Sequence, residues 1–240
     1  MNFPTTFETP TLVPMGMSER ADQALIQLQN QGFEVYTGLS PELAERFAEM
    51  GEQEDIAEMC PNDATRFAED NVEKWVAKGD TTLNEFGRGV FSIVDMKKPI
   101  DELVVPGFGW DGPELPTPPK NTEARPIPQH KIDEFKLVMD GLGLQTTFAV
   151  RINGLYAGKG LSKALSTIIV DGGNVLYGAT DYWLETWKSN HAGPKVYTAN
   201  GWEKQPIEID TLRPSVKAGG IDVPDTRTWY TYPNELLPSN

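Results

Sequence analysis

The stretch TTFAVRINGLYAGKGLSKALSTIIVDGG, residues 146–173, decides how the chain folds. Its first seven residues, 146–152, are β-branched and apolar and predict a buried strand. The glycine loop 157–160 follows, and the apolar residues after it recur on one face of a helix that we expect to end at Gly172 and Gly173. A strand, a glycine loop and a helix in this order favour a site where backbone N–H groups close on a phosphate.

The spacing of the loop residues distinguishes the kinds of phosphate loop that follow a strand. A P-loop requires glycine where Asn153 stands and serine or threonine where Gly160 stands. A dinucleotide-binding fingerprint that begins at Gly158 requires a third glycine where the chain has Lys163. Neither of these two loops fits the sequence.

Residues 157–162 (AGKGLS) resemble a third kind, the acyl-CoA pyrophosphate loop of the GNAT superfamily of N-acyltransferases, with the pattern Arg/Gln-x-x-Gly-x-Gly/Ala. The likeness rests on the central Gly160. Ala157 replaces the first arginine or glutamine, which removes one phosphate contact, and Ser162 replaces the last small residue. An ordinary tight turn is the alternative for this loop.

A second stretch, residues 190–202 (NHAGPKVYTANGW), resembles the later motif of the same family. Asn190 precedes Tyr197 by seven residues, and a glycine–aromatic pair follows four residues after the tyrosine. The chain departs from the pattern at Gly193, where alanine is usual, and at Trp202, where phenylalanine is usual. Two motifs in the right order, each after a suitable strand, carry the resemblance.

The resemblance implies a mixed α/β fold in which helices flank a central, twisted, mixed β-sheet. Residues 1–32 would form an N-terminal extension. Residues 33–240 would form a single GNAT-like domain with an acceptor-side half (33–112), a proline-rich connection (113–131) and a CoA-binding half (132–240). Capping residues and periodicity further predict helices at 18–32, from Ser40-Pro41 onward, after Cys60-Pro61 and near 190–201. Strands are expected at 33–39, 90–96, 103–110, 175–187, 203–210 and 227–232.

The resemblance also implies acetyl-CoA as the cosubstrate. Backbone N–H groups at the end of the central strand would bind the pantetheine arm and stabilise the thioester oxygen, which becomes negative when an amine attacks. The N-terminus of the following helix would bind the pyrophosphate. The expected CoA-binding residues are Val150, Ile152, Ala157, Gly158, Lys159, Gly160, Leu161, Ser162 and Asn190. No metal is expected, since one cysteine and two histidines disfavour a metal site.

By the same resemblance, Tyr197 would act as the general acid that protonates the leaving thiolate, with a packing role as the alternative. The central strand has no acidic residue, although many relatives carry a glutamate there. Glu185 is our candidate general base, and its alternative is an ordinary solvent-facing strand residue. Other candidate bases are Asp181, Asp111 and a chain of water molecules. Trp183 and Trp187 alternate with Glu185 on one face, where all three would line an acceptor pocket or pack.

The net charge of −14 is concentrated in residues 1–100, which carry 18 acidic and 8 basic residues. This acidic half favours a cationic acceptor and disfavours nucleic acid and membranes as partners, although a solvated surface would explain it too. The sequence shows no signal peptide and no long apolar run, which favours a cytoplasmic protein.

We therefore expect an N-acetyltransferase that transfers the acetyl group of acetyl-CoA to a primary amine of a cationic acceptor by direct attack on the thioester, with a homodimer as a possible assembly. The alternative is a non-catalytic GNAT-like module that binds acyl-CoA or another protein. The absence of an acid from the central strand and the alanine at position 157 favour this alternative, whereas the tyrosine motif favours the enzyme.

Overall fold

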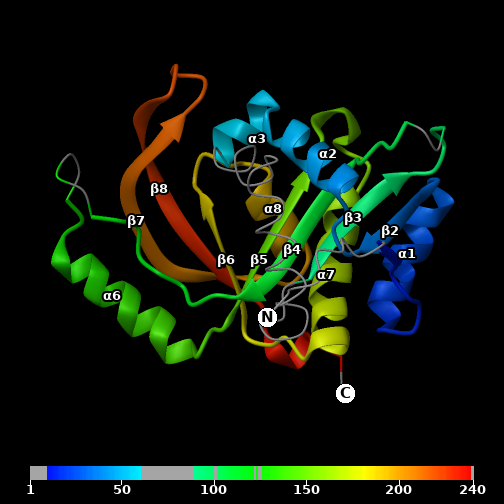
Figure 1. Ribbon diagram of the computed structural model, residues 1–240. Coiled ribbons are helices and arrows are strands. Elements are labelled where there is room, and N and C mark those ends of the chain that lie inside the picture. Colours follow the sequence, from blue (N-terminus) through cyan, green and yellow to red (C-terminus); the bar gives the residue numbers. More distant parts are fainter. Residues whose placement is uncertain (1–9, 61–88, 100–101, 122, 124–125, 239–240) are drawn as a thin grey trace, which may run out of the picture.

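The structure is a computed structural model that describes residues 10–60, 89–99, 102–121, 123 and 126–238 (Figure 1). Its helices are α1 (Glu19–Asn30), α2 (Pro41–Gly51), α3 (Glu54–Met59), α6 (Gln129–Met139), α7 (Leu161–Tyr177) and α8 (Gly193–Ala199). Its strands are β1 (Thr11–Leu12), β2 (Phe33–Thr37), β3 (Val90–Asp95), β4 (Gly107–Pro113), β5 (Thr146–Ile152), β6 (Tyr182–Trp187), β7 (Glu203–Ser215) and β8 (Ile221–Thr231). The helix expected after Cys60-Pro61 lies outside the described residues.

All the strands join one sheet in the order β1-β2-β3-β4-β5-β6-β8-β7. Neighbouring strands are antiparallel except β5 and β6, which are parallel. β5 and β6 pair at two positions, Thr146 with Tyr182 and Thr147 with Trp183. Since β5 has seven residues and β6 has six, most of their length is unpaired with each other. The two strands therefore separate and leave a gap in the interior of the sheet.

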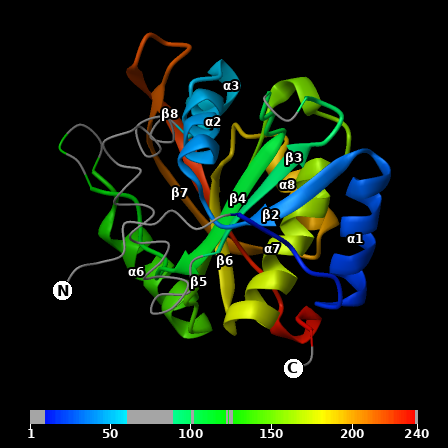
Figure 2. The ribbon, with the colours of Figure 1, turned by 45° about the vertical axis from the view of Figure 1, so that its right-hand side comes forward.

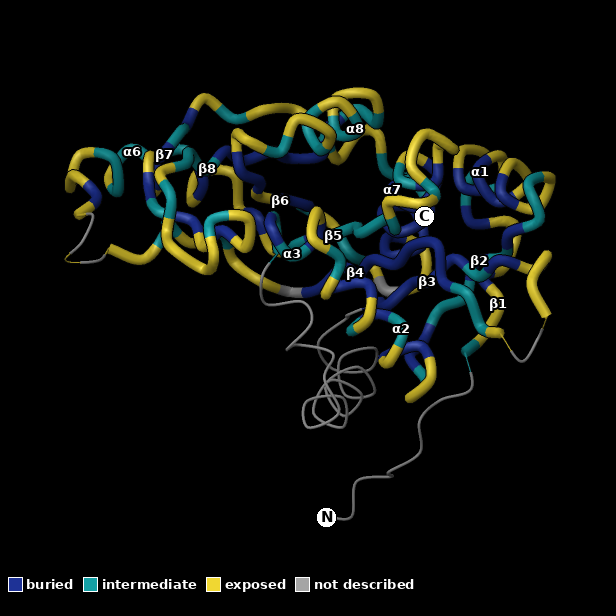
Figure 3. Tube along the Cα trace, turned by 90° about the horizontal axis from the view of Figure 1, so that it is seen from above, coloured by how far each residue is buried: buried dark blue, intermediate teal, exposed yellow. Residues whose placement is uncertain are grey.

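Helices cover both faces of this sheet (Figure 3). α1 and α7 lie side by side on one face and share a core with β2, β3 and β5 (Figure 2). α2 covers the other face, where Phe47 stacks on Phe108 of β4 with ring centroids 4.1 Å apart. α6 packs beside β7 and β8, where Phe135 meets Trp229 edge to face at 5.0 Å. The predicted mixed α/β fold, with helices on both sides of a mixed sheet, is confirmed.

Local capping signals place the first helices. The Ser18 hydroxyl accepts the N–H of Ala21 at the start of α1, and the Ser40 hydroxyl accepts the N–H of Leu43 at the start of α2, as predicted. Although α1 lies in the segment expected as an extension, Ala21 and Leu28 are fully buried in the main core. This segment therefore contributes to the core that supports α7.

The predicted end of α7 is wrong. The helix continues through Gly172 and Gly173 and ends at Gly178, whose φ of +67° is left-handed. Both internal glycines are buried, and Gly173 passes close to Asp111 of β4 and Tyr182 of β6. They allow a close approach of helix and sheet and do not end the helix. The strand expected at 175–187 accordingly begins only at Tyr182.

The predicted strands at the C-terminus are shorter than the observed β7 and β8, which form a long hairpin extending beyond the rest of the sheet (Figure 1). β7 lies at the sheet edge, where proline is tolerated, so Pro214 does not end it. Arg213 of β7 ties the hairpin to α3 through Glu58 at 2.7 Å and pairs with Asp225 at 3.0 Å. Helix α6 was not predicted. Among the described residues, no helix has both the length and the apolar character needed to cross a membrane.

Candidate active site

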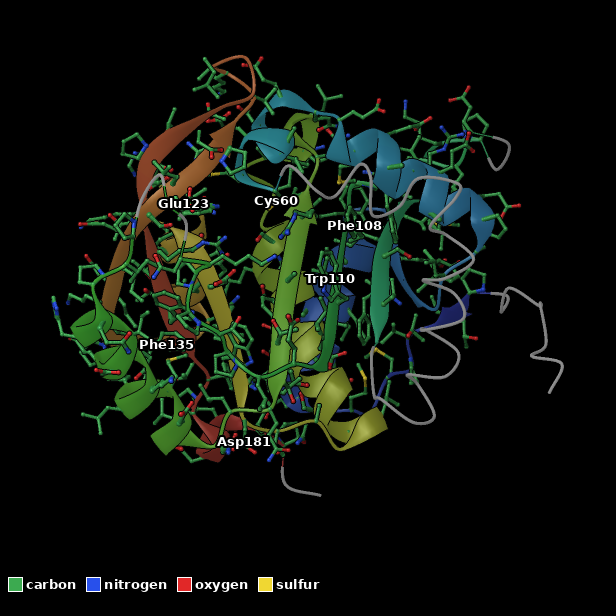
Figure 4. All side chains as sticks on the ribbon, turned by 60° about the vertical axis from the view of Figure 1, so that its left-hand side comes forward. Cys60, Phe108, Trp110, Glu123, Phe135 and Asp181 are labelled. Carbon is green, nitrogen blue, oxygen red and sulfur yellow. The ribbon has the colours of Figure 1, made fainter. Side chains whose placement is uncertain are left out.

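A cavity of about 320 Å³ lies where β5 and β6 separate. Trp110 of β4 and Cys60, which follows α3, contribute to its wall (Figure 4). Three residues predicted for the site, Glu185, Asn190 and Tyr197, also line it. The volume is sufficient for a small molecule. The gap in the sheet is therefore the candidate active site.

The backbone of β5 presents unpaired edges to this gap. The N–H of Asn153 donates to Pro106 on the β4 side at 2.9 Å, whereas the N–H of Thr146 donates to Asp181 on the β6 side at 3.3 Å. Because successive residues of a strand direct their backbone groups to opposite sides, the N–H groups of Val150 and Ile152 face the side where β6 has diverged. From this side they could donate to a group that enters the gap.

The glycine loop lies at the N-terminus of α7. Residues 157–160 are exposed, and both Gly158 and Gly160 have left-handed φ values, +78° and +77°. Gly160 is the N-cap and has no side chain to occupy the N–H groups of the first turn. Leu161 is buried and anchors that turn in the core, whereas Ser162 is half-buried. The loop thus offers N–H groups and the positive end of a 17-residue helix to an anion.

Two other predicted residues flank these N–H groups. Ala157 caps the short turn Gly154–Tyr156 and carries no polar side-chain atom. The Lys159 ammonium lies over the ring of Tyr156, 4.5 Å from its centroid. Its positive charge is therefore held at the loop, where it can assist anion binding.

Asn190 fixes α8 to β6. Its Oδ1 accepts the N–H of Gly193 at 3.1 Å, and its Nδ2 donates to Thr186 Oγ1 at 3.1 Å. A Cβ atom on Gly193 would lie 2.8 Å from Asn190 Nδ2 and 3.1 Å from the Tyr197 hydroxyl. Glycine at position 193, where the family pattern has alanine, therefore lets the Asn190 amide and the Tyr197 hydroxyl lie close to the first turn of α8.

Tyr197 is half-buried and lines the cavity. Burial raises the pKa of Tyr197 to about 12, while the nearby Arg151 charge and a hydrogen bond with Thr186 act in the opposite direction. Since Thr186 Oγ1 already accepts from Asn190, its own proton is available to the Tyr197 oxygen.

Glu185 is held by Arg227 of β8, whose guanidinium donates to Glu185 Oε1. The same guanidinium stacks on Trp187, 3.8 Å from the ring centroid. Burial raises the pKa of Glu185 above its ordinary value, and Arg227 partly offsets this rise. The side chain keeps 35% of its surface exposed because it faces the open cavity. A carboxylate with a raised pKa in a cavity is suited to accept a proton.

The other candidate bases lie elsewhere. Asp111 is fully buried below α7, where it accepts from the N–H of Gly89 at 2.8 Å and the hydroxyl of Tyr182 at 3.0 Å. Asp181 accepts from Thr180 and from the side-chain amide of Asn234 at the opposite end of β6. Of the acidic residues named from the sequence, only Glu185 lines the cavity among the described residues.

Three charged residues of the cavity, Glu114, Arg151 and Arg227, were not predicted from the sequence. Arg151 belongs to the central strand itself, and strand alternation would have placed it on the face opposite Val150. Arg227 is brought to Glu185 only by the pairing of β6 with β8, which no local pattern specifies.

No family model and no curated protein matches the sequence, whereas solved structures match the fold. The ribosomal-protein-S5-alanine acetyltransferase of Vibrio fischeri matches with a TM-score of 0.58 at 13% identity, over 87% of this chain and 96% of that one. The spermidine N-acetyltransferase of Vibrio cholerae, solved with CoA and spermine, matches with 0.52 at 12%, over 84% and 95%. A GNAT-family acetyltransferase of Streptococcus pneumoniae matches with 0.52 at 11%, over 82% and 99%. The chain therefore has the fold of the GNAT acetyltransferases.

Proposed function

We propose that this protein is an N-acetyltransferase that moves the acetyl group of acetyl-CoA to a primary amine. One observation carries the proposal: the gap between β5 and β6 unites backbone donors, a protonated phenol and a carboxylate around one cavity. Acyl transfer from CoA can use an unpaired strand edge, a helix N-terminus without a side-chain cap, and an acid.

The residues present fit acetyl-CoA. The first-turn N–H groups of α7 and the charge of Lys159 would hold the pyrophosphate. The N–H groups of Val150 and Ile152 would donate to the pantetheine arm and to the thioester oxygen. Within the first motif, Ala157 is the departure that removes a contact, because its methyl group offers none to a phosphate.

In the proposed reaction, Glu185, Tyr197 and the β5 backbone each have one task. Glu185 accepts the proton of the attacking amine, whose nitrogen forms the new C–N bond at the acetyl carbon. The negative oxygen of the tetrahedral intermediate accepts from the β5 N–H groups. When the C–S bond breaks, Tyr197 donates its proton to the leaving sulfur. The amide and CoA are released, and solvent restores the two protonation states.

The acidic N-terminal half supports an acceptor that arrives as a cation, because a protonated amine is attracted by negative surface charge over long range. The spermidine N-acetyltransferase with the same fold was solved with spermine, which is such an amine. We include polyamines, amino acids and arylalkylamines among the acceptors to be tested.

The proposal is tested by titrating acetyl-CoA into the protein in a calorimeter and then measuring CoA release with this panel of amines. We expect binding, turnover of at least one amine, and turnover about 10²-fold lower in Tyr197→Phe with acetyl-CoA affinity retained. Tyr36→Phe is the matched control, since it deletes a phenol hydroxyl that contacts Glu34 on β2, away from the cavity. Binding without turnover of any amine would favour the acyl-CoA-binding module, and absence of binding would refute both functions.

A further inference from the structure

The acceptor side of the gap carries a guanidinium on the central strand. Side chains of β5 alternate: Phe148, Val150 and Ile152 contact the core beneath α1 and α7, whereas Ala149 contacts the core beneath α2. Arg151 therefore points to the α2 side, which is the face opposite the helix that would hold CoA. A positive charge occupies this side of the strand, and a negative charge would suit an ammonium better.

The guanidinium of Arg151 lies at the open edge of the strand. Its Nη1 donates to the carbonyl oxygen of Val150 at 3.0 Å, and that carbonyl points toward the gap. The guanidinium carbon lies 5.2 Å from the ring centroid of Trp110. Its charge also lowers the pKa of Tyr197, which places it within electrostatic reach of the phenol. Arg151 thus lies beside the atoms that would meet an acceptor.

The opposite wall holds the second guanidinium, that of Arg227, which already pairs with Glu185 and stacks on Trp187. Glu114 is the remaining acidic residue of the lining among the residues that the structure describes. In this described part of the lining, two guanidinium groups stand against two carboxylates, which favours an acceptor with both charges over a polycation. Groups of both signs are therefore present around the cavity.

Three tryptophans contribute flat apolar surface to the wall. Trp110, Trp183 and Trp187 all line the cavity, and they come from two strands on opposite sides of the gap. Tryptophan walls favour a flat, apolar group between them. A cavity of about 320 Å³ holds a molecule of amino-acid size and is small for a long flexible chain.

We propose that the acceptor is a zwitterion: a primary amine that also carries a carboxylate, as in an α-amino acid with an aromatic side chain. The inference rests on the proposed acetyl transfer and names its substrate class. Glu185 receives the amine, Arg151 binds the carboxylate through its planar donors, and the tryptophans contact the side chain. A phosphate or phosphonate would offer the same anionic oxygens, so the test separates the two anions.

The test compares acceptors that differ in the anion alone. The pairs are L-tryptophan with tryptamine and L-phenylalanine with phenethylamine, together with the aminophosphonate analogue of phenylalanine and spermine. We expect kcat/KM to be at least about tenfold higher for each amino acid than for its decarboxylated amine, since a hydrogen bond to a charged group contributes that much. A higher kcat/KM for the aminophosphonate than for phenylalanine would support an anionic acceptor but refute the carboxylate as its anion.

The variant Arg151→Gln then assigns the preference to a residue. The ratio of kcat/KM between the amino acid and the amine should fall to within about threefold of unity, mainly through KM for the amino acid, and Arg151→Lys should recover part of it. Arg46→Gln is the matched control, because it removes a guanidinium on α2 that pairs with Glu49 and is not among the residues lining this cavity.

The outcomes separate the two levels of the proposal. Equal or better turnover of tryptamine or spermine by the unmodified protein would overturn the zwitterionic acceptor and leave acetyl transfer standing. A ratio unchanged in Arg151→Gln would overturn the role of Arg151. Acetyl-CoA binding without turnover of any amine would overturn acetyl transfer and, with it, the acceptor class.

Discussion

Two adjacent glycines inside α7 should respond in opposite directions to the same substitution. Glycine in the middle of a helix is about 1 kcal/mol less favourable than alanine, so Gly→Ala at either position gains helix propensity. At Gly172 the new Cβ would lie 3.4 Å from Met17 Sδ and 3.4 Å from the ring of Phe91, which are ordinary contacts. Gly172→Ala should therefore stabilise the protein by up to about 1 kcal/mol.

At Gly173 the same atom would lie 2.0 Å from Asp111 Oδ2 and 2.3 Å from the Tyr182 hydroxyl. A normal contact needs about 3.5 Å, so these two groups, which are hydrogen-bonded to each other at 3.0 Å, must move by more than 1 Å. Overpacking costs about 1–3 kcal/mol and a broken buried hydrogen bond about 1–3 kcal/mol, against a gain of about 1 kcal/mol. The net destabilisation of Gly173→Ala is about 3 kcal/mol.

Thermal unfolding followed by circular dichroism distinguishes the two variants. For a chain of this size 1 kcal/mol corresponds to about 2–4 °C, so Tm should rise by up to about 4 °C in Gly172→Ala and fall by about 6–12 °C in Gly173→Ala. Adding Tyr182→Phe to Gly173→Ala removes one of the two obstructing atoms. The double variant should therefore be destabilised by less than the sum of the destabilisations of the two single variants. Equal shifts of Tm in both glycine variants would refute the close contact of α7 with Asp111.

Other expected outcomes concern pH and salt. With the Tyr197 pKa at about 12, the phenol stays protonated at every pH below about 10. We therefore expect kcat to rise with pH as the amine and Glu185 lose protons, and not to fall before about pH 10. A decrease of kcat near neutral pH would contradict this. The Lys217 N–H, with Arg213 and Ser215, lowers the pKa of Glu58 to about 2, so this group stabilises the fold above about pH 4.5, and the contribution is lost as the pH falls toward 2. Urea unfolding of Glu58→Gln should accordingly show a smaller loss of stability between pH 6 and pH 3 than the unmodified protein, and an unchanged acid loss would argue against the buried pair. Raising NaCl from about 0.05 to 0.5 M should increase KM for polyamines more than KM for amino acids, because screening weakens attraction to the acidic surface; identical salt profiles would contradict this.

The parts of the fold that depend on near neighbours could be predicted from the sequence. Ser18 and Ser40 cap their helices within three residues, and the strand 146–152 is specified by its own β-branched residues. The interior glycines of α7 look like a stop signal locally. Their actual role depends on Asp111, which the fold brings close although it is distant in the sequence. Glycine can end a helix, and it can also let a helix pack closely against a sheet. The sequence alone does not distinguish these two roles.

The site divides in the same way. Tyr197 and Asn190 could be predicted because a motif fixes their spacing within one turn and one short helix. The partner of Glu185 could not be predicted, because Arg227 is distant in the sequence and comes close to Glu185 only when β8 pairs with β6. Helix α6 was missed for a related reason. Only Phe135 and Met139 of this helix are fully buried, so its apolar face is narrow and its packing comes from Trp229 on another strand.

Charge acts in this protein both over long range and at hydrogen-bond distance. Only the long-range effect could be predicted from the sequence. Composition counts every acidic residue of the first 100, and such a surface draws any protonated amine through bulk solvent, within a screening length of about 10 Å at 0.1 M salt. Recognition depends on groups within hydrogen-bond distance of the acceptor, and the charged residues of the described lining are Arg151, Arg227, Glu114 and Glu185. Under the proposed function, the negative surface would concentrate amines generally, and Arg151 would select among them those that carry a carboxylate. For that reason the salt dependence of KM and the preference for a carboxylate should vary independently: salt changes the first, and Arg151→Gln abolishes the second.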